Sequence, residues 1–451
     1  MRSYVLAIIL LFLVPTALFS PFVGLLGWAW ISYFNPTAFT WGFTRSVPVG
    51  LLIAVPTLLG LPFTRQRKAP PLTRETILLA VLWFWFLVTT LNVYVSPLFV
   101  HHLADTAQKL LTVSKIFLMV FVSLMLVVDS RRLRIWYLVT AGIFAFFALK
   151  SAVFGVLTAG QYKIYGPGNS MIADNNDFGL AMNIALPMFV CMARTERSQF
   201  LRWTFRVAIP LGIIAVVLTY SRGAMVGLMV LLVFWASKSR YKVLGAAFLI
   251  VTVLAIFAYA PGAWIQRMET IRTAPETDAS AQSRLRAWKF ALDLARDHPV
   301  FGGGFETFTL PLYAQYAIDD SHGPHSIYFQ VLAEHGVPGL LLFLSLIASC
   351  WWSCRQLIRR FRDSGSLTYL AEYARMVQLS TLAFLVSGAF LGRAYFDLFY
   401  QLVATAIILK SLARREVANV RVSELDWNMP LSPVPSYDLS PRLYFGRLKP
   451  Q

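Results

Sequence analysis

The residues of this chain best suited to chemistry are arginines and one histidine at the borders of apolar runs. Arg222 lies in a tight turn between two such runs, and Arg284 and Arg286 begin a helical pattern in a long polar segment. His325 lies where the chain returns to an apolar run. A guanidinium binds phosphate or carboxylate oxygens through paired hydrogen bonds, and an imidazole can act as a general base near neutral pH. Together these residues indicate a site for an anionic substrate.

Each of these residues also has a structural explanation. Two passes within residues 207–237 leave about 15 residues, or roughly 22 Å of helix, for each, whereas the hydrocarbon core is about 30 Å thick. We therefore expect Arg222 below the outer membrane surface, where it either binds an anion in an outward-facing cavity or reaches up to the lipid headgroups. A basic helix face is usually a solvated face, and a histidine at a membrane border is often merely interfacial. For Arg222 both interpretations stay open.

Further candidates lie in other polar segments. Asp174 and Asn175 belong to an acidic loop rich in asparagine, and Glu306 follows three consecutive glycines by two residues. The glycines could bring backbone N–H groups against phosphate oxygens, although a tight turn explains them equally well. Arg393 lies in another outer turn, one helical turn before Asp397. That spacing favours a structural ion pair over a catalytic one.

The composition places most of the chain in a membrane. The sequence has 451 residues, of which 57% are hydrophobic and only 14% are charged, whereas about a quarter of an ordinary soluble domain is charged. The mean hydropathy is +0.61. The apolar runs are continuous, which favours helices that satisfy their own backbone hydrogen bonds over strands of alternating polarity. We predict an all-α polytopic membrane protein.

About twelve transmembrane helices are expected. Residues 4–34, interrupted by Pro15 and Pro21, form one broken span or two short ones. With one broken span at the start, both termini lie on the same side of the membrane. The other spans are predicted near residues 47–63, 76–95, 111–128, 135–157, 178–193, 207–220, 224–237, 243–260, 326–353, 375–391 and 396–411.

The basic residues orient these spans. The net charge of +18 falls in short clusters on alternate loops between the apolar runs. In a soluble protein such a charge would indicate nucleic acid, but here the retention of basic loops in the cytoplasm, with attraction to anionic lipid, explains it. The clusters therefore mark the cytoplasmic side, and no nucleic-acid partner is expected.

The outer side receives one long loop, residues 261–325. Leu285, Trp288, Leu292 and Ala295 recur in it at helical spacing, which predicts an amphipathic helix over residues 281–297 at the outer surface. We divide the chain into an N-terminal transmembrane region, a transmembrane core that includes this loop, and a proline-rich cytoplasmic tail: residues 1–200, 201–411 and 412–451.

No cofactor, metal or disulfide is expected. The chain lacks the GxxxxGK[ST] and GxGxxG motifs that bind nucleotides. Its three cysteines, Cys191, Cys350 and Cys354, lie in or near apolar runs without the spacing of metal ligands. An enzyme of this kind needs an electrophile that is already activated, and a lipid-linked diphosphate held by arginines fits that need.

Several short motifs together resemble the signature region of the O-antigen ligase and polymerase superfamily. They are Ser221-Arg222-Gly223, Arg284-Leu-Arg-Ala-Trp288, His298-Pro299-Val-Phe-Gly-Gly-Gly, His325-Ser-Ile-Tyr328 and Glu334-His-Gly336-Val-Pro-Gly339, with Asp174-Asn175-Asn176 upstream. The N-terminal part resembles the O-glycosylation ligases associated with exosortase A systems, through Pro21-Phe-Val-Gly24, Trp28-Ala-Trp30, Asn35-Pro36 and Thr40-Trp-Gly-Phe43. The motifs agree in order and spacing, and the resemblance covers residues 1–411.

The resemblance implies an inverting, metal-independent glycosyltransferase of the bacterial inner membrane. Such an enzyme takes a glycan from an undecaprenyl diphosphate carrier at the periplasmic face and passes it to a hydroxyl of a glycan, lipid or protein acceptor. By motif, the catalytic residues are His325, Arg222 and Arg284, although Arg286 is close enough to confuse the assignment of the loop arginine. The arginines would hold the diphosphate, and His325 would deprotonate or orient the acceptor hydroxyl. Ser326 stands where the family often has Asn, which puts any supporting role of that position in doubt.

The remaining candidates are residues for substrate contacts. They are Arg286, Asn175, Asp174, Glu306 and Arg393, with Tyr165 and Asn169 as further candidates for sugar or acceptor contacts.

Three other functions stay open. A polysaccharide polymerase would join lipid-linked repeat units and would differ from a ligase only in its acceptor. A lipid-linked glycan transporter often has internal repeats and broken helices at the membrane midplane, and no repeat relates the two halves of this sequence. A structural scaffold would tolerate the replacement of each candidate residue.

Overall fold

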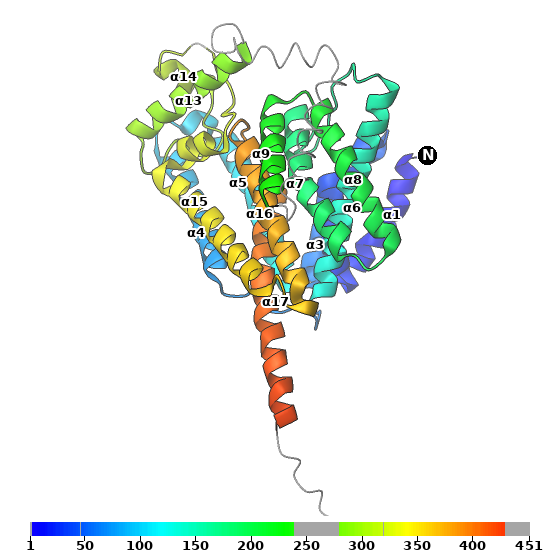
Figure 1. Cartoon of the computed structure of the whole chain (residues 1–451). Coiled ribbons are helices and arrows are strands. Elements are labelled where there is room, and N and C mark those ends of the chain that lie inside the picture. Colours follow the sequence, from blue (N-terminus) through cyan, green and yellow to red (C-terminus); the bar gives the residue numbers. More distant parts are fainter. Residues whose placement is uncertain (1, 46, 239–278, 319, 429–451) are drawn as a thin grey trace, which may run out of the picture. The chain divides into compact units, whose positions relative to one another are not determined.

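The computed structural model describes residues 2–45, 47–238, 279–318 and 320–428. Every described element is a helix, and these ranges contain no strand, which confirms the all-α prediction. Two compact units divide the chain, residues 1–412 and residues 413–451. The candidate residues all belong to the first unit, whose helices are labelled in Figure 1.

The first unit begins with two antiparallel helices, α1 (Arg2–Phe19) and α2 (Pro21–Phe34). Pro21 occupies the first position of α2, where its missing N–H leaves no hydrogen bond unmade. The hydroxyl of Ser3 donates to the carbonyl of Trp41, beyond the end of α2, so the two helices run in opposite directions. Next come η1 (Pro36–Phe39), η2 (Phe43–Arg45) and α3 (Val49–Gly60), which packs on both α1 and α2.

This helical hairpin decides between the two alternatives left open for residues 4–34. α1 continues through Pro15, so the break lies at Ser20 and residues 4–34 form two helices. Ser32, near the end of α2, donates to Asp397 at the start of the last helix, α17 (Asp397–Asn428). The start of α1 and the start of α17 therefore lie at the same end of the unit. That both termini lie on one side stays a prediction: it counted α1 and α2 as a single pass, and residues 429–451 lie outside the described residues.

Side-chain caps start three of the central helices. Thr73, Asp129 and Asp174 each accept a hydrogen bond from a backbone N–H of the following turn, which satisfies donors that a helix start leaves without partners. The central elements are α4 (Arg74–Val95), η3 (Val100–His102), α5 (Leu103–Leu126), α6 (Ser130–Leu157), α7 (Asn175–Thr195), α8 (Gln199–Leu218) and α9 (Arg222–Lys238).

α7 is the most buried of the long apolar helices and packs against α8, α9 and α16 (Thr368–Gly388). Small residues allow this close approach, since a Cβ on Gly179 would lie 2.6 Å from the Cβ of Ala224 in α9. The amide of Asn183 in α7 donates to the carbonyl of Ala224 at 2.7 Å. These contacts fix α9, which begins at Arg222, to α7.

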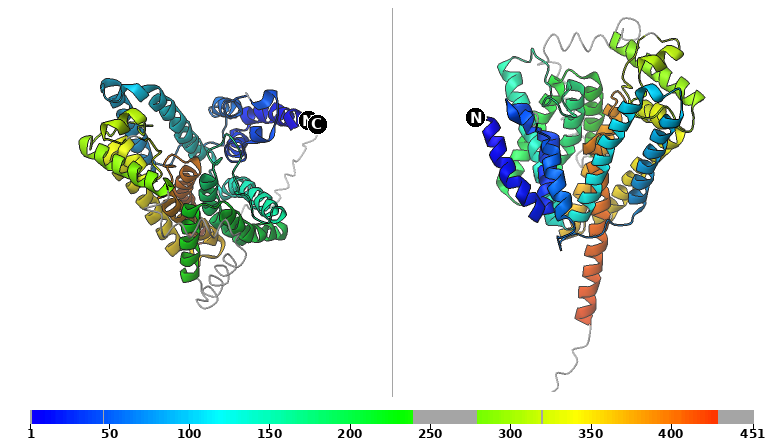
Figure 2. Two further views of the ribbon diagram at one scale, coloured as in Figure 1. Left: turned by 90° about the horizontal axis from the view of Figure 1, so that it is seen from above. Right: turned by 180° about the vertical axis from the view of Figure 1, so that it is seen from behind.

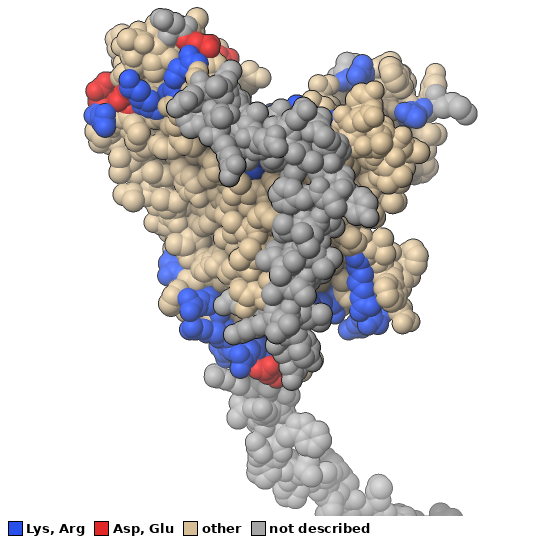
Figure 3. Space-filling model, turned by 45° about the horizontal axis from the view of Figure 1, so that its top comes forward, with Lys and Arg blue, Asp and Glu red and all other residues tan. Residues whose placement is uncertain are grey.

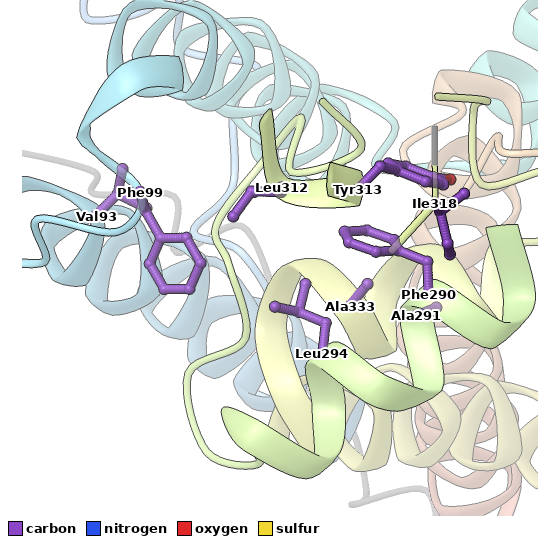
Figure 4. Close-up of a cluster of buried hydrophobic side chains, with 9 residues drawn as sticks. All are labelled: Val93, Phe99, Phe290, Ala291, Leu294, Leu312, Tyr313, Ile318 and Ala333. Atoms are coloured by element: carbon purple, nitrogen blue, oxygen red, sulfur yellow. The ribbon is translucent and has the colours of Figure 1, made fainter. Parts of the chain in front are cut away.

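Two helices, one long and one short, form a cap over the first turns of α15 (Ile327–Phe361). They are α13 (Ala279–Asp297) and α14 (Leu310–Gln315). Figure 4 shows Phe290 of α13 facing Tyr313 of α14, and their rings stack with centroids 4.1 Å apart. Ala333 of α15 belongs to the same buried cluster. α13 confirms the helix predicted over residues 281–297.

An ion-pair cluster joins α4, α15 and α17 at the end of the unit opposite the start of α17. The fully buried Glu75 accepts hydrogen bonds from Lys410, Ser349 and Ser353, each at 2.7 Å. A buried carboxylate is tolerated only with such partners. The part of α17 that belongs to the first unit, residues 397–412, is therefore held at Asp397 near one end and at Lys410 near the other.

Seven of the described helices are long and apolar enough to cross a membrane: α1, α4, α5 with η3, α6, α7, α8 and α15. The shorter α2, α3 and α9 are also apolar. In Figure 3 nearly all described side chains in the middle of the visible face are uncharged, and Lys and Arg gather toward its ends. Figure 2 shows α1–α3, in dark blue, at one edge of the first unit and the cap, in yellow-green, at another. The predicted span at residues 243–260 lies outside the described residues, and the count of twelve stays a prediction.

Candidate functional site

The turn between α16 and α17, residues 389–396, contacts the starts of α9 and α15, two of the elements that carry candidate residues. A Cβ on Gly223, next to Arg222, would lie 3.0 Å from the Cβ of Phe390. A Cβ on Gly392 would lie 2.6 Å from Pro324, the neighbour of His325. The first turns of α9 and α15 are therefore brought together by what we call the 389–396 turn.

Arg393 extends this convergence to the start of α7. Its guanidinium makes a two-pronged ion pair with the buried Asp177, with Nε 2.7 Å from Oδ1 and Nη2 against Oδ2. The expected pair of Arg393 with Asp397 is wrong, because Asp397 accepts instead from Ser32 and from its own helix start at Leu398. A spacing of one helical turn brings two side chains together only inside a helix, and Arg393 precedes α17.

His325 lies two residues before the start of α15, just before its N-cap residue Ser326, and is half-buried. Its backbone has a φ of 44°, in the left-handed region. Burial lowers the pKa of His325 below its usual 6.5, the positive charge of Arg284 and the electrostatic effect of His322 lower it further, and Asp174 opposes them. The lowered pKa favours the neutral imidazole, the form that can accept a proton. Arg284 and Asp174 are close enough to His325 to influence it electrostatically.

The two loop arginines lie on different faces of α13. Ser283 and Ala287 are buried, and Arg284 between them is half-buried, whereas Arg286 is exposed. Trp288, one turn after Arg284, stacks on Phe329 in the first turn of α15, with ring centroids 5.2 Å apart. The structure therefore brings Arg284 to the region of His325 and leaves Arg286 at the surface.

Arg222 is the first residue of α9 and is half-buried. Ser221 before it accepts a hydrogen bond from the backbone N–H of Ala224 at 3.2 Å, which caps the helix. The helix that precedes Arg222, α8, has 20 residues, or about 30 Å of length. The first leg of this hairpin is longer than expected, because α8 begins at Gln199, before the predicted span at residues 207–220, and includes Arg202 and Arg206.

Asp174 and Asn175 stand at the start of α7. The amide of Asn175 donates to the carbonyl of Thr219 at 2.8 Å, which ties this start to the turn before Arg222. Asp174 is exposed, and one of its oxygens caps α7 through the N–H of Asn176 at 2.8 Å. Asp174 and Asn175 thus have structural roles at the start of α7, next to the turn before Arg222. Of the further candidates, Tyr165 is exposed and Asn169 has a left-handed φ of 54°.

The three glycines do not offer their N–H groups to a ligand. The N–H of Gly302 donates to the carbonyl of His298 at 3.0 Å, that of Gly303 to Ala333 at 2.9 Å, and that of Gly304 to Glu334 at 2.9 Å. The phosphate-binding interpretation is therefore wrong and the tight-turn interpretation is correct. We call residues 299–306 the glycine segment.

Glu306 ends the glycine segment with its side chain partly exposed. Its carboxylate pairs with Lys109 of α5 at 2.7 Å. Its backbone has a left-handed φ of 57°. The negative charge of Glu306 also contributes to the raised pKa of Arg393, after the larger effect of the hydrogen bond with Asp177. Glu306 therefore lies in the electrostatic environment of the 389–396 turn.

Sequence reasoning gave no role to four residues of this region, Asp177, Gln330, Glu334 and Tyr395, although Glu334 opens one of the quoted motifs. Gln330 accepts from the N–H of Ala394 at 3.0 Å, and Tyr395 donates to the buried Glu334. The signal for Glu334 was available, because a carboxylate inside an apolar run needs a partner. No local pattern pairs Arg393 with Asp177, 216 residues away. Among the described residues, no group of His, Cys, Asp or Glu could hold a metal ion.

Comparison with known families gives two matches. Residues 207–344 match the O-antigen ligase family, and residues 1–196 match a family of unknown function, DUF5935. Comparison with curated proteins gives no match. The first match supports the predicted superfamily and a membrane function of the O-antigen ligase or polymerase type, and with the apolar helices it indicates a multi-pass membrane protein. The exosortase-associated subfamily stays a prediction.

The two matched regions contribute to one region of the fold. The ligase match contains Arg222, Arg284 and His325, and the DUF5935 match contains Asp174 and Asn175. Arg393 lies outside both ranges, on the turn that contacts them.

Proposed function

We propose that the chain is a glycosyltransferase of the bacterial inner membrane that acts as an O-antigen ligase. It transfers a glycan from an undecaprenyl diphosphate carrier to an acceptor hydroxyl at the periplasmic face, with inversion and without a metal. The observation that carries the proposal is that Arg284 lies close enough to the half-buried His325 to lower its pKa, while one turn contacts both the neighbour of Arg222 and the neighbour of His325.

The arginines supply the electrostatic part of the proposed reaction. Arg222 and Arg284 bind the donor diphosphate by charge-assisted hydrogen bonds. The bond between the anomeric carbon and the diphosphate oxygen breaks, and its electron pair leaves with the diphosphate. The guanidinium groups offset that developing charge, and removing one such donor costs roughly 10²–10³-fold in rate.

His325 supplies the proton transfer. The acceptor hydroxyl oxygen attacks the anomeric carbon from the side opposite the diphosphate, which inverts the configuration, and its proton passes to the neutral imidazole. General-base help of this kind contributes about 10²–10⁴-fold. Diphosphate leaves without protonation, so no acid is needed on the leaving side.

The experiment compares Arg222→Ala, Arg284→Ala, Arg286→Ala and His325→Ala with the wild type in the native host. Membrane levels of each variant are measured, with blots for polysaccharide and for the lipid-linked precursor. We expect three variants, all except Arg286→Ala, to lose product and to accumulate the precursor at normal protein levels. Arg286 is the matched control because it lies two residues from Arg284 on the exposed face of the same helix.

Two results decide against the proposal. Product that persists in all four variants refutes glycosyl transfer by these residues and turns attention to transport or scaffolding. Loss of long chains with normal transfer of single units indicates the polymerase alternative.

A further inference from the structure

The break in α15 leaves backbone groups that the glycine segment satisfies. Gly336 has a φ of 68° and a ψ of −173°, which no helix allows. In an uninterrupted helix the carbonyl of Glu334 would accept from residue 338, but Pro338 has no N–H. Gly304 supplies the missing donor at 2.9 Å, and the N–H of Val337 turns outward to the carbonyl of Pro299 at 2.8 Å. The glycine segment is therefore inserted in the break.

The side chain of Glu334 joins this insertion to the 389–396 turn. Glu334 is 1% exposed. One carboxylate oxygen accepts from the backbone N–H of Glu306 at 3.2 Å, and the other accepts from the hydroxyl of Tyr395. A single buried carboxylate thus connects the end of the glycine segment with the turn that carries Arg393.

Residues 327–335 form a short helical segment between this bridge and His325. Gln330 fixes one side of the segment to the turn through Ala394, and Phe329 stacks on Trp288 of the helix that carries Arg284. A segment of nine residues is about 13 Å long and rigid. Its orientation at the Glu334 end therefore sets the position of His325 at the other end.

We propose that Glu334 is a positioning residue for glycosyl transfer: its carboxylate locks the glycine segment and Tyr395 to the break in α15 and so holds His325 in place. This inference rests on the proposed function. This positioning role differs from the roles proposed for the arginines and the histidine, because Glu334 contacts neither the donor nor the acceptor.

Thr307 allows a direct test of whether Glu334 holds the glycine segment in the break in α15. It follows Glu306, is fully buried, and its hydroxyl has no hydrogen-bond partner, so Thr307→Cys changes little. The native cysteines are all buried, which keeps background labelling by a maleimide low. We expect Thr307→Cys to be protected alone or with Glu334→Gln, and to react at least about tenfold faster with Glu334→Ala, because local opening exposes it.

Turnover of purified protein on a lipid-linked glycan donor gives the second readout. Glu334→Ala should lower kcat at least about tenfold and leave the donor KM within about twofold, because a displaced base slows chemistry more than binding. Turnover is expressed per donor-binding site, so that misfolded protein does not count. Glu334→Gln keeps an oxygen for the N–H of Glu306 and should restore most of the rate. Glu372→Ala, which removes an ion-paired carboxylate of α16, is the matched control and should behave as the wild type.

Each outcome decides the matter. Wild-type labelling of Thr307→Cys in Glu334→Ala, or equal losses in Glu334→Ala and Glu334→Gln, overturns the inference. If Glu334→Ala also exposes the native cysteines, the variant has unfolded and Tyr395→Phe takes its place; that variant must show faster labelling of Thr307→Cys or the inference fails. A wild type that binds donor but transfers no glycan refutes the proposed function instead, while the labelling rates still report on the lock.

Discussion

At the scale of single residues, His325 has a backbone conformation that few residues adopt. Its φ of 44° lies in the left-handed region, which costs roughly 1–2 kcal/mol for a residue with a Cβ. The contact of Pro324 with Gly392 allows no bulkier side chain at residue 392. Strain of this kind collects at functional sites, where surrounding structure holds a side chain in one position.

The pH dependence of transfer tests the proposed role of His325. The imidazole accepts a proton only when neutral, so the rate falls as the pH drops through its lowered pKa. The charge of Arg284 is one cause of that lowering. In Arg284→Gln the pKa of His325 should rise, and the acid limb of kcat/KM should move to higher pH by up to about one unit. The position of the limb is measured, whatever the loss in absolute rate.

Arg286→Gln is the control for this shift. It removes the same charge from the same helix at an exposed position, where water and salt screen its effect. Its acid limb should coincide with that of the wild type. Equal shifts in both variants would show that His325 responds to overall charge and not to Arg284.

At the scale of helices, the break in α15 is the element that organises the site. Gly336 and Pro338 could be seen in the sequence, and a proline inside an apolar run predicts a kink. The insertion of residues 299–306 in that kink could not be predicted, because it depends on which distant donors satisfy the freed carbonyls. The predicted helix over residues 281–297 was confirmed as α13 because its apolar spacing is local. The start of α5 at Leu103, earlier than predicted, lies among polar residues that hydropathy does not register.

Gly336→Ala tests the break. A Cβ at residue 336 would lie 2.2 Å from the carbonyl oxygen of Val300, in addition to the unfavourable φ of 68°. We expect a clear fall in the thermal midpoint of purified protein. The loss in free energy of unfolding should exceed the roughly 1–2 kcal/mol that the backbone conformation alone costs.

Gly365→Ala separates these two contributions. Gly365 has a φ of 55°, and no heavy atom lies within 4 Å of the position that a Cβ would take there, so it carries the backbone cost without the collision. A midpoint for Gly336→Ala no lower than that of Gly365→Ala would mean that the glycine segment moves aside freely.

At the scale of the whole first unit, the site joins regions that are far apart in the chain. Asp177 lies in the region matched by DUF5935, and Arg393 lies beyond the ligase match. The sequence suggested the candidate residues through short motifs, since each motif is local. It could not show that a turn outside both matched regions brings them together, because that depends on the packing of α7, α9, α15 and α16. The region matched by DUF5935 thus supplies Asp177, the acidic residue of the ion pair with Arg393.

This ion pair can be tested by a double-mutant cycle. Asp177→Ala leaves the half-buried Arg393 without its carboxylate and should destabilise the protein by roughly 3 kcal/mol, whereas the double variant Asp177→Ala with Arg393→Ala should recover part of that loss. Thermal unfolding of purified protein gives the values.

The pair of Asp293 with Arg296 on α13 is the matched control. Its atoms are 3.0 Å apart and the arginine side chain is 76% exposed, so its removal should cost between about 0 and 1 kcal/mol. Similar coupling in the two pairs would contradict a structural role for the contact between Asp177 and Arg393.

The antiparallel arrangement of α1 and α2 also bears on how the protein enters the membrane during synthesis. Residues 3–44 contain no Lys, Arg, Asp or Glu, so the turn at Ser20 carries no charge that would retain it in the cytoplasm. In the folded protein the guanidinium of Arg132 lies 5.0 Å from the ring of Phe22, beside that turn. The basic residues beside that turn therefore belong to later parts of the chain, Arg132 and the segment 65–68 that it contacts through Gln66, and both are synthesised after the hairpin itself.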